Sequence, residues 1–176
     1  MARKILVVVD MQNDFVNGAL GSDEAKAIVD NVVNKINEFK GEIIVTYDTH
    51  QDDYMETREG MYLPVPHCIE NTEGWKINDK VEKVLVERNV VRVKKPTFGS
   101  VKLVEMLRGI DEKNTEVTII GLCTDICVVS NAMLLKANYP EMNIIVDASC
   151  CAGVTVESHN AALTTMKMCQ IDVIGV

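Results

Sequence analysis

The sequence predicts a three-layer α/β fold, with a mostly parallel, Rossmann-like sheet of about six strands between two layers of helices. Apolar runs rich in Val and Ile alternate along the chain with segments whose apolar residues recur at helical spacing. The runs are nearly continuous in apolar residues, which is typical of parallel strands covered by helices on both faces. Short links between these segments favour a single sheet with helices packed against it.

Each strand is predicted from a short apolar run bounded by polar or turn-forming residues. In chain order the predicted strands are Ile5–Val9, Glu42–Tyr47, Val90–Lys94, Glu116–Gly121, Asn143–Val146 and Ile171–Ile174. The first long helix is predicted to begin at Ser22, because a serine followed by Asp23 and Glu24 is a favourable helix start. The remaining predicted helices are Asp79–Glu87, Ser100–Leu107, Asp125–Ala137 and Val156–Met168.

The length and charge of the chain limit the kinds of protein that it can be. A chain of 176 residues without a repeat or linker is expected to form a single domain over residues 1–176. The net charge of −8 and the scattered Lys and Arg residues argue against a nucleic-acid partner, which would need a basic patch. No apolar stretch approaches the roughly 20 residues of a membrane span. The N-terminal run ends at Asp10 without a cleavage site, so we interpret it as a strand and expect a cytoplasmic protein.

The cysteines do not form a recognisable framework. There are six, irregularly spaced and without a CxxC pair, which favours neither a zinc knuckle nor a disulfide scaffold. Four of them are expected to be buried free thiols: Cys68, Cys150, Cys151 and Cys169.

Three reactive side chains are predicted to lie at one edge of the sheet. Asp10 follows the first strand, Lys95 follows the third, and Cys127 opens the helix after the fourth. Ligands of open α/β sheets bind beyond the carboxyl ends of the strands, where the strand order reverses, so the three can converge on one crevice. Each also has an ordinary structural explanation, as a turn aspartate, a solvated lysine and a packed cysteine.

These side chains suit covalent acyl transfer. A helix N-terminus and a nearby Lys95 ammonium favour the thiolate form of Cys127, which is the nucleophilic form. Asp10 can accept the thiol proton and return it to a leaving amine. Backbone N–H groups of the turn at residues 121–124 and of Cys127 can form an oxyanion hole.

Two motifs resemble those of the isochorismatase-like cysteine hydrolases, and the resemblance covers the whole chain. Residues 10–15, Asp-Met-Gln-Asn-Asp-Phe, resemble the opening motif with the catalytic base. Residues 121–128, Gly-Leu-Cys-Thr-Asp-Ile-Cys-Val, resemble the motif that ends in the catalytic cysteine. The resemblance implies that Asp10 is the base and Cys127 the nucleophile. It also implies a cis peptide before Cys123, whose N–H joins that of Cys127 in the oxyanion hole.

The catalytic lysine of the family is less clearly marked, because Lys94 and Lys95 are adjacent. Family members usually have Ser-Ala-Phe shortly after this lysine, and the segment Lys95-Pro96-Thr97-Phe98 departs from that pattern. Aligning Phe98 with the aromatic residue of the family selects Lys95. Lys94 would then point to the opposite face of its strand.

The segment from Asp48 to Asn78 is predicted to be irregular and functional, and it contains two of the three histidines. Asp48, His50 and His67 resemble the metal site of nicotinamidases within the family. Glu59 is the expected additional ligand, with Glu56 and Asp52 as alternatives. Mixed carboxylate and imidazole ligands suit zinc, with iron or manganese as further possibilities. Alternatively, the aspartate caps a turn and the histidines are merely exposed.

The resemblance implies an amidohydrolase that converts nicotinamide to nicotinate and ammonia through a thioester. Phe15, Phe98 and Trp75 are the residues expected to flank the ring of this small-molecule substrate, with Tyr62 as a further possibility. As many relatives do, the chain is expected to form a homo-oligomer. Two alternatives remain: a hydrolase of another small amide or carbamoyl compound, and a non-catalytic thiol redox or binding protein that uses Cys123 and Cys127.

Overall fold

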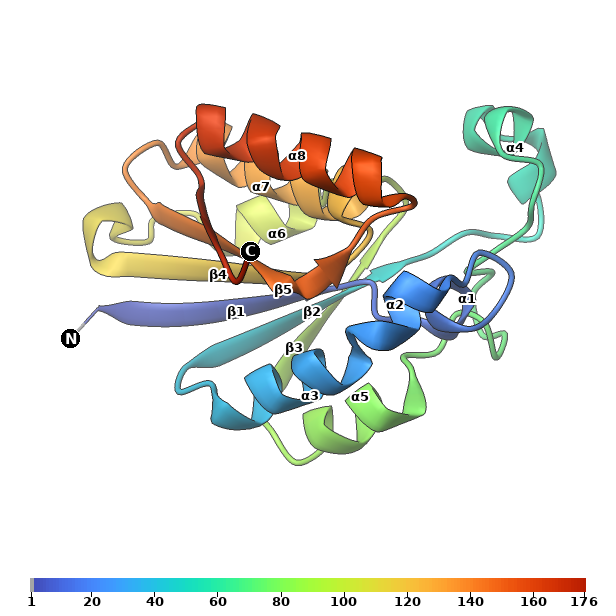
Figure 1. Cartoon of the computed structure of the whole chain (residues 1–176), viewed down its shortest axis with the longest axis horizontal. Helices are drawn as coiled ribbons and strands as arrows, with labels where there is room; N and C mark the ends of the chain where they lie inside the picture. The colour runs from blue at the N-terminus through green and yellow to red at the C-terminus, as the bar shows by residue number, and fades with distance from the viewer. Residues whose placement is uncertain (1) are drawn as a thin grey trace.

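The structure, a computed structural model, describes residues 2–176 and contains one six-stranded sheet (Figure 1). The strands are β1 (Arg3–Val9), β2 (Glu42–Asp48), β3 (Val90–Lys95), β4 (Thr115–Leu122), β5 (Asn143–Ala152) and β6 (Asp172–Ile174). Their order is β3-β2-β1-β4-β5-β6, and every neighbouring pair is parallel. The predicted three-layer α/β fold is therefore confirmed.

The helical elements connect the strands. They are α1 (Asn13–Val16), α2 (Asp23–Ala27), α3 (Val29–Glu38), η1 (Tyr54–Glu56), α4 (Arg58–Tyr62), α5 (Asp79–Leu85), α6 (Val101–Met106), η2 (Glu112–Asn114), η3 (Thr124–Val128), α7 (Val129–Asn138) and α8 (Val156–Met168). Within residues 2–176, no helix is both long enough and apolar enough to cross a membrane.

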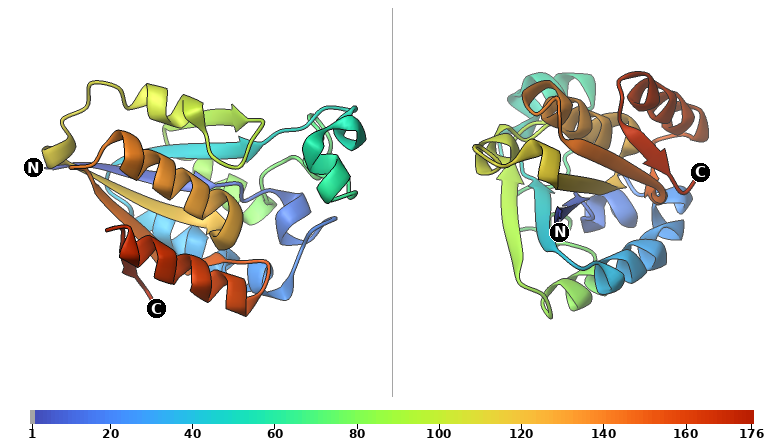
Figure 2. Two further views of the ribbon diagram at one scale, coloured as in Figure 1. Left: turned by 90° about the horizontal axis from the view of Figure 1, so that it is seen from above. Right: turned by 90° about the vertical axis from the view of Figure 1, so that its left-hand side faces the viewer.

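The side chains of β1 alternate between two apolar cores, one on each face of the sheet. Ile5, Val7 and Val9 pack in the core covered by α6, α7 and α8. Leu6 and Val8 pack in the core covered by α3 and α5. Figures 1 and 2 show the two helical layers on opposite sides of the sheet. Because β1 is buried on both faces, its sequence is a continuous apolar run rather than an alternating one.

The strand order reverses at β1, and this reversal locates the site. The chain passes from β1 outward through β2 and β3, and then returns to place β4 on the other side of β1. Ligands of such sheets bind beyond the carboxyl ends of the strands at this point. Asp10 directly follows β1, and the turn η3 with Cys127 follows β4. Lys95 is the last residue of β3 and is paired with Asp48 at the end of β2.

Some element boundaries differ from the prediction. The helix predicted from Ser22 is divided at Ile28 into α2 and α3. The irregular segment after β2 contains η1 and α4, which project beyond the carboxyl edge of the sheet (Figure 1). The helix predicted from Asp125 begins as the π-helical turn η3 before it becomes α7. Cys169 is half-buried rather than buried.

Strand β5 continues well beyond the predicted end at Val146. The polar residues Asp147 and Ser149 interrupt the apolar pattern, but both contact α3. Lys35 Nζ donates to Asp147 Oδ2 at 2.6 Å, and Asn31 Nδ2 donates to the Ser149 carbonyl at 2.7 Å. These tertiary contacts support an extension that the apolar run alone does not indicate.

Candidate active site and metal centre

Asp10, Lys95 and Cys127 meet in the protein interior at the carboxyl ends of the strands. Lys95 Nζ lies 2.6 Å from Asp10 Oδ2 and 3.4 Å from Cys127 Sγ. Thr46 Oγ1 donates a hydrogen bond of 2.6 Å to Asp10 Oδ1 and so orients the carboxylate. Asp10 and Lys95 are 0% and 1% exposed, and Cys127 is 4% exposed. The structure thus brings together the three residues predicted to be catalytic.

Two unusual backbone positions allow this approach. Asp10 has a φ of +48°, in the left-handed region that Asp tolerates better than most residues, so the chain turns as soon as it leaves β1. Gly121 of the nucleophile motif has a φ of +118°, and a Cβ atom at this position would lie 2.1 Å from the Val9 carbonyl oxygen. Glycine is therefore required for β4 to pass β1 beside Asp10.

The alternation of side chains along β3 separates the two adjacent lysines. Lys95 points into the site, whereas Lys94 is exposed on the other face, as expected for successive residues of a strand. Lys94 pairs with Glu70, and its ammonium lies 5.1 Å from the centre of the Trp75 ring. Lys95, and not Lys94, therefore contacts Cys127.

Asp10, Lys95 and Cys127 shift one another's pKa values. Burial raises the pKa of Cys127 well above its ordinary value; the charge of Asp10 adds to this increase and Lys95 opposes it. Burial also raises the pKa of Asp10, again against the effect of Lys95. Burial by itself would lower the pKa of Lys95, but the negative charges of Asp10 and Asp48 outweigh it and raise that pKa.

The raised pKa of Cys127 favours the thiol form. Burial of Cys127 therefore opposes the thiolate form, which the helix terminus and Lys95 were expected to favour. Asp10 Oδ2 accepts no well-directed hydrogen bond from the described residues, although it lies in an ion pair with Lys95. An oxygen with a raised pKa and unused hydrogen-bonding capacity is suited to accept the thiol proton.

Cys127 lies on η3, a π-helical turn that continues into α7. Such turns are found frequently at functional sites. The Cys123 carbonyl accepts hydrogen bonds from the N–H groups of Ile126 and Val128, at 3.1 and 3.0 Å. The peptide bond between Leu122 and Cys123 is cis, as the resemblance implied. Cys123 and Cys127 line the same pocket, and the role of their N–H groups in an oxyanion hole stays a prediction.

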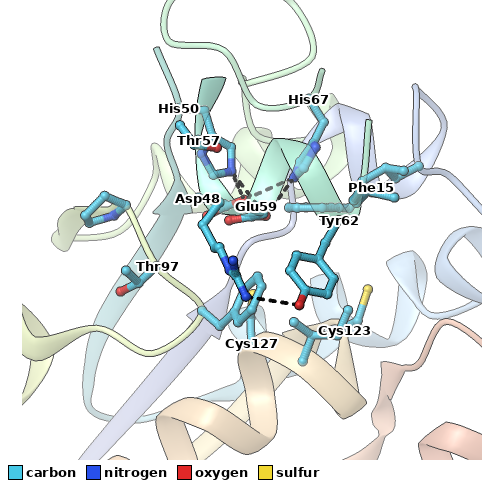
Figure 3. Close-up of a pocket in the computed structure, with 16 residues that line it drawn as sticks. Phe15, Asp48, His50, Thr57, Glu59, Tyr62, His67, Thr97, Cys123 and Cys127 are labelled. Carbon is cyan, nitrogen blue, oxygen red and sulfur yellow. Dashed lines mark hydrogen bonds and ion pairs between the residues drawn. The ribbon is translucent and has the colours of Figure 1, made fainter. Parts of the chain in front are cut away.

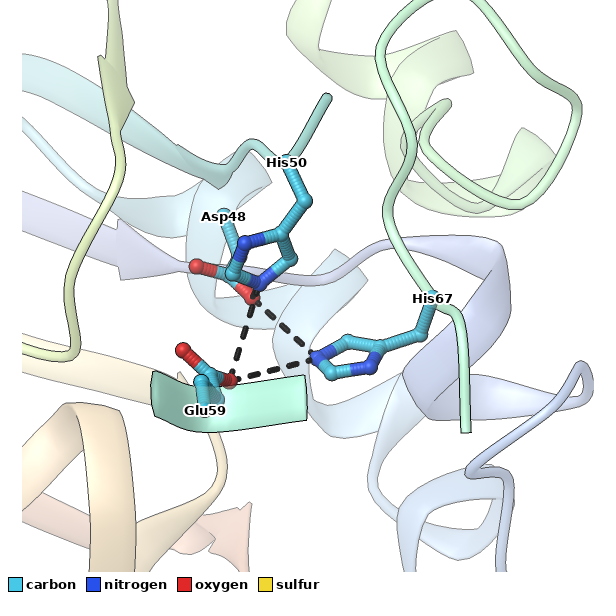
Figure 4. A group of neighbouring side chains, drawn as sticks. All are labelled: Asp48, His50, Glu59 and His67. Atoms are coloured by element: carbon cyan, nitrogen blue, oxygen red, sulfur yellow. Dashed lines mark hydrogen bonds and ion pairs between the residues drawn. The ribbon is translucent and has the colours of Figure 1, made fainter. Parts of the chain in front are cut away.

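Four side chains next to the catalytic residues form a cluster of potential metal ligands (Figure 4). Asp48, His50, Glu59 and His67 each offer one ligand atom, and these atoms all lie within 4.8 Å of one another. His50 Nε2 is 3.1 Å from Asp48 Oδ2, and it is 3.6 Å from Glu59 Oε1. His67 Nε2 is 3.6 Å from both of those oxygens. Asp52 and Glu56, the alternatives to Glu59, are exposed and outside the cluster.

The donor atoms and their spacing fit a divalent ion. Ligands about 2.0–2.1 Å from a tetrahedral zinc lie roughly 3.4 Å apart, close to the separations of this cluster. The Val65 carbonyl contacts His67 Nδ1 at 2.8 Å, which leaves Nε2 directed to the cluster. Burial acts to raise the pKa of Asp48, but hydrogen bonds with His50 and His67 outweigh it and lower that pKa. Asp48 is thus available as an anionic ligand.

A cavity of about 670 Å³ is lined both by the cluster of potential metal ligands and by Cys127 (Figure 3). Phe15, Phe98 and Tyr62 line it, as expected for residues that flank a substrate ring. Phe15 is nearly buried and packs 5.5 Å from the His67 ring, whereas Phe98 and Tyr62 are exposed at the mouth. The volume is in the range of small-molecule pockets, about 300–1,000 Å³.

Trp75, which was expected to flank the substrate ring, does not line this cavity. Trp75 lines a separate cavity and packs on Tyr47, with 5.3 Å between the ring centres. Its indole Nε1–H donates to Thr49 Oγ1 at 2.9 Å. The sequence placed Trp75 in an irregular segment, and only the tertiary packing reveals which side of that segment it occupies.

Gln12 is a functional support that the sequence analysis did not identify. Its side chain is fully buried, accepts from the Asp48 N–H at 2.7 Å and donates to the Asp48 carbonyl at 2.8 Å. It also donates to the Trp75 carbonyl at 2.9 Å. Gln12 therefore fixes the backbone of a metal ligand against the segment that follows Asp10. The signal in the sequence that could have identified Gln12 was its position, as a polar residue, within the opening motif.

Comparisons with known proteins identify the family of this chain. Residues 4–176 match the family model for the isochorismatase domain. The nicotinamidase of Schizosaccharomyces pombe is 29% identical, over 97% of this chain and 92% of that protein. The nicotinamidase/pyrazinamidase of Mycobacterium tuberculosis is 26% identical, over 97% and 98% of the two chains.

Solved structures share the fold over nearly the whole chain. The crystal structure of nicotinamidase PncA from Bacillus subtilis has a TM-score of 0.85 and 27% identity, covering 98% of this chain and 99% of that one. The pyrazinamidase of Pyrococcus horikoshii in complex with zinc has a TM-score of 0.79 and 26% identity, with 99% of both chains covered. The family match spans both motifs and all three buried reactive residues, and the chain therefore belongs to the isochorismatase family.

Proposed function

We propose that this chain is an amidohydrolase that converts nicotinamide to nicotinate and ammonia through a thioester at Cys127. The observation that carries the proposal is that Cys127, in contact with the buried Lys95–Asp10 pair, lines the same cavity as a cluster of four potential metal ligands. The trio suits acyl transfer, and the cluster suits recognition of a heteroaromatic nitrogen. The nicotinamidases of several organisms among the relatives give the proposal further support.

In the acylation step, Asp10 removes the proton from Cys127 and the thiolate sulfur attacks the carboxamide carbon. The electron pair of the C=O bond moves to oxygen, and the N–H groups of Cys123 and Cys127 stabilise this oxyanion. Asp10 then donates its proton to the amide nitrogen, the C–N bond breaks, and ammonia leaves. Lys95 stabilises the negative charge that moves between Asp10 and Cys127, because its ammonium is in contact with both.

In the deacylation step, water replaces ammonia as the attacking group. Asp10, again a carboxylate, removes a proton from the water as its oxygen attacks the thioester carbon. The tetrahedral oxyanion collapses, the C–S bond breaks, and Cys127 leaves as a thiolate. The proton on Asp10 returns to the sulfur, which restores the resting site, and the nicotinic acid that is released loses its carboxyl proton to ammonia or water and becomes nicotinate.

We propose that Asp48, His50, Glu59 and His67 hold a divalent ion, with zinc favoured and iron or manganese as alternatives. When bound, the ion would supply a Lewis acid suited to the pyridine nitrogen of the ring. Asp48 links the two halves of the site, since its Oδ2 faces the histidines while its Oδ1 lies 3.4 Å from Lys95 Nζ. Phe15 and Phe98 provide apolar walls for the ring.

A panel of amides with defined metal loading tests the function. We expect the zinc-loaded protein to release ammonia from nicotinamide and to process benzamide poorly, because benzamide lacks the ring nitrogen. Elemental analysis should find the ion, and removal by a chelator should raise the KM for nicotinamide. A metal-free protein that hydrolyses both amides equally would contradict the nicotinamidase proposal.

A hydrolase of another small amide is the second candidate. The observation that favours it is the cavity of about 670 Å³, which is larger than one pyridine ring requires and is open where Tyr62 and Phe98 are exposed. The same amide panel distinguishes it, because a larger amide or a carbamoyl compound would then be turned over faster than nicotinamide.

The thiol redox alternative rests on Cys123 and Cys127, both of which are free thiols at the pocket. A Cys123–Cys127 disulfide isolated from cells would support it.

We also propose that the protein is cytoplasmic and that it forms a homo-oligomer. Exposed apolar residues favour association: Met61 is 69% exposed, Tyr62 76% and Val101 63%. Light scattering tests the oligomeric state, and cell fractionation tests the compartment.

A further inference from the structure

Asn131 is a fully buried polar side chain between the segments that carry Lys95 and Cys127. Its Nδ2 donates to the Cys127 carbonyl at 2.8 Å and to the Phe98 carbonyl at 3.1 Å. Its Oδ1 accepts from the Ser100 N–H at 2.9 Å. A side-chain amide has two donor hydrogens and one acceptor oxygen, so both kinds of group are in use. All three partners are backbone groups of segments that line or flank the site.

The first of these segments contains the nucleophile. Cys127 is on the π-helical turn η3, and the helix changes to regular α geometry at Val129, where the backbone hydrogen-bonding pattern shifts. Asn131 lies one turn further along α7 and holds the Cys127 carbonyl from within the same helix. This contact restrains the backbone from which the Cys127 sulfur projects.

The second segment follows Lys95 and contributes the Phe98 wall of the cavity. It ends at Ser100, whose Oγ caps α6 by accepting from the Leu103 N–H at 3.1 Å. The strands β3 and β4 are separated in the sheet by β2 and β1, so ladder hydrogen bonds do not hold the segments after them together. Asn131 provides a direct link between those two segments.

We propose that Asn131 is a positioning residue for the hydrolytic reaction, which fixes Cys127 relative to the Phe98 wall and the segment of Lys95. This inference rests on the proposed function. Attack on the carboxamide requires a distance of about 3–3.5 Å, and a misplacement of about 1 Å can cost roughly 100-fold in rate. Asn131 touches no substrate; it acts through the backbone of residues that do.

The test compares Asn131 variants with a matched control between the same two helices. Tyr139→Phe removes a buried hydrogen bond of 2.5 Å from the Tyr139 hydroxyl to the Val104 carbonyl, which joins α7 to α6 away from the site. Asn131→Ala removes all three contacts, whereas Asn131→Asp retains an acceptor for the Ser100 N–H. For each protein, Tm, kcat and KM are measured with the amide that the wild type hydrolyses fastest.

We expect Asn131→Ala to lower kcat about 100-fold and Asn131→Asp to lower it about 10-fold, with partial rescue reflecting the retained contact. Tyr139→Phe should lower Tm, because the Val104 carbonyl loses its partner, while kcat stays within about twofold of wild type. If Asn131→Ala does not fold, the kcat of Asn131→Asp tests the proposal. Unchanged kcat in folded Asn131→Asp, or an equal loss in Tyr139→Phe, would overturn the inference.

Amide hydrogen exchange keeps this test independent of the proposed function. Exchange of the peptide spanning residues 123–128 should rise in both Asn131 variants and remain at the wild-type level in Tyr139→Phe. A wild type that hydrolyses none of the amides would refute the proposed function, while exchange would still report whether Asn131 holds the nucleophile segment. If the peptide spanning residues 123–128 exchanges equally in all four proteins, Asn131 does not restrain this segment.

Discussion

Replacing Lys95 by methionine should remove activity and a large part of the stability, whereas the same change at the neighbouring Lys94 should do neither. Lys95 is 1% exposed, and its ammonium contacts Asp10, Asp48 and Cys127. Losing one partner of a buried ion pair typically costs about 3–5 kcal/mol, because the remaining charge is left uncompensated. This is a large fraction of the roughly 5–15 kcal/mol that stabilises a typical domain.

The effect on turnover follows from Asp10. Without the ammonium, burial and the charge of Asp48 should push the pKa of Asp10 still higher, so that it becomes protonated and cannot accept the thiol proton. We expect a loss in kcat of about 10²–10⁴-fold, the usual contribution of general-base catalysis. Lys94 forms a partly exposed pair with Glu70, and its loss should cost about 0–1 kcal/mol.

The assay combines urea unfolding with ammonia release at a temperature where both variants remain folded. Lys94→Met is the matched control, because it makes the same chemical change one residue away on the opposite face of β3. A more severe loss of activity in Lys94→Met than in Lys95→Met would refute the assignment of Lys95.

The other predictions concern the nucleophile, the base, the metal ligands and pH. Cys127→Ala should abolish turnover yet unfold only about 1–2 kcal/mol more easily, as judged by urea titration. Asp10→Asn should slow acylation about 10²–10⁴-fold in a rapid-quench measurement. Glu59→Gln and His67→Ala should yield metal-poor protein by elemental analysis, whereas Glu56→Gln should retain the wild-type content. Burial raises the pKa of Cys127, so the rate of iodoacetamide labelling of the substrate-free protein should continue to rise with pH above about 8.5. The labelling rate of an ordinary thiol begins to level off there, because its pKa is about 8.5. A labelling rate that is already independent of pH at neutral pH would contradict this.

The sheet and the catalytic trio were predictable because they follow from local patterns. Strands buried on both faces give continuous apolar runs, and the polar residues that end them collect at one edge of a parallel sheet. Strand alternation predicts only that Lys94 and Lys95 face opposite sides of the sheet, and the resemblance to the family, through Phe98, selected Lys95. The cluster with Glu59 depended on the resemblance to the family, and the structure selects it over Glu56 and Asp52 because only Glu59 reaches the histidines.

Features that depend on tertiary packing were not predictable. The packing of Trp75 against Tyr47 depends on how the long segment after β2 folds back, and no periodicity encodes that path. The raised pKa of Cys127 depends on its burial, which a helix terminus and a lysine in the sequence do not reveal. Asn131 has no sequence signal, since a single asparagine within a helix gives no indication of three backbone partners elsewhere.

Acid quenching of the wild-type protein during turnover of nicotinamide tests the central claim most directly. Peptide mass spectrometry of the quenched protein should find a nicotinoyl group on the peptide that contains Cys127. The adduct should accumulate and decay at rates consistent with ammonia and nicotinate release, and it should be absent from Cys127→Ala. Turnover that continues in Cys127→Ala, or a nicotinoyl group on Cys123 instead, would contradict the assignment of Cys127 as the nucleophile.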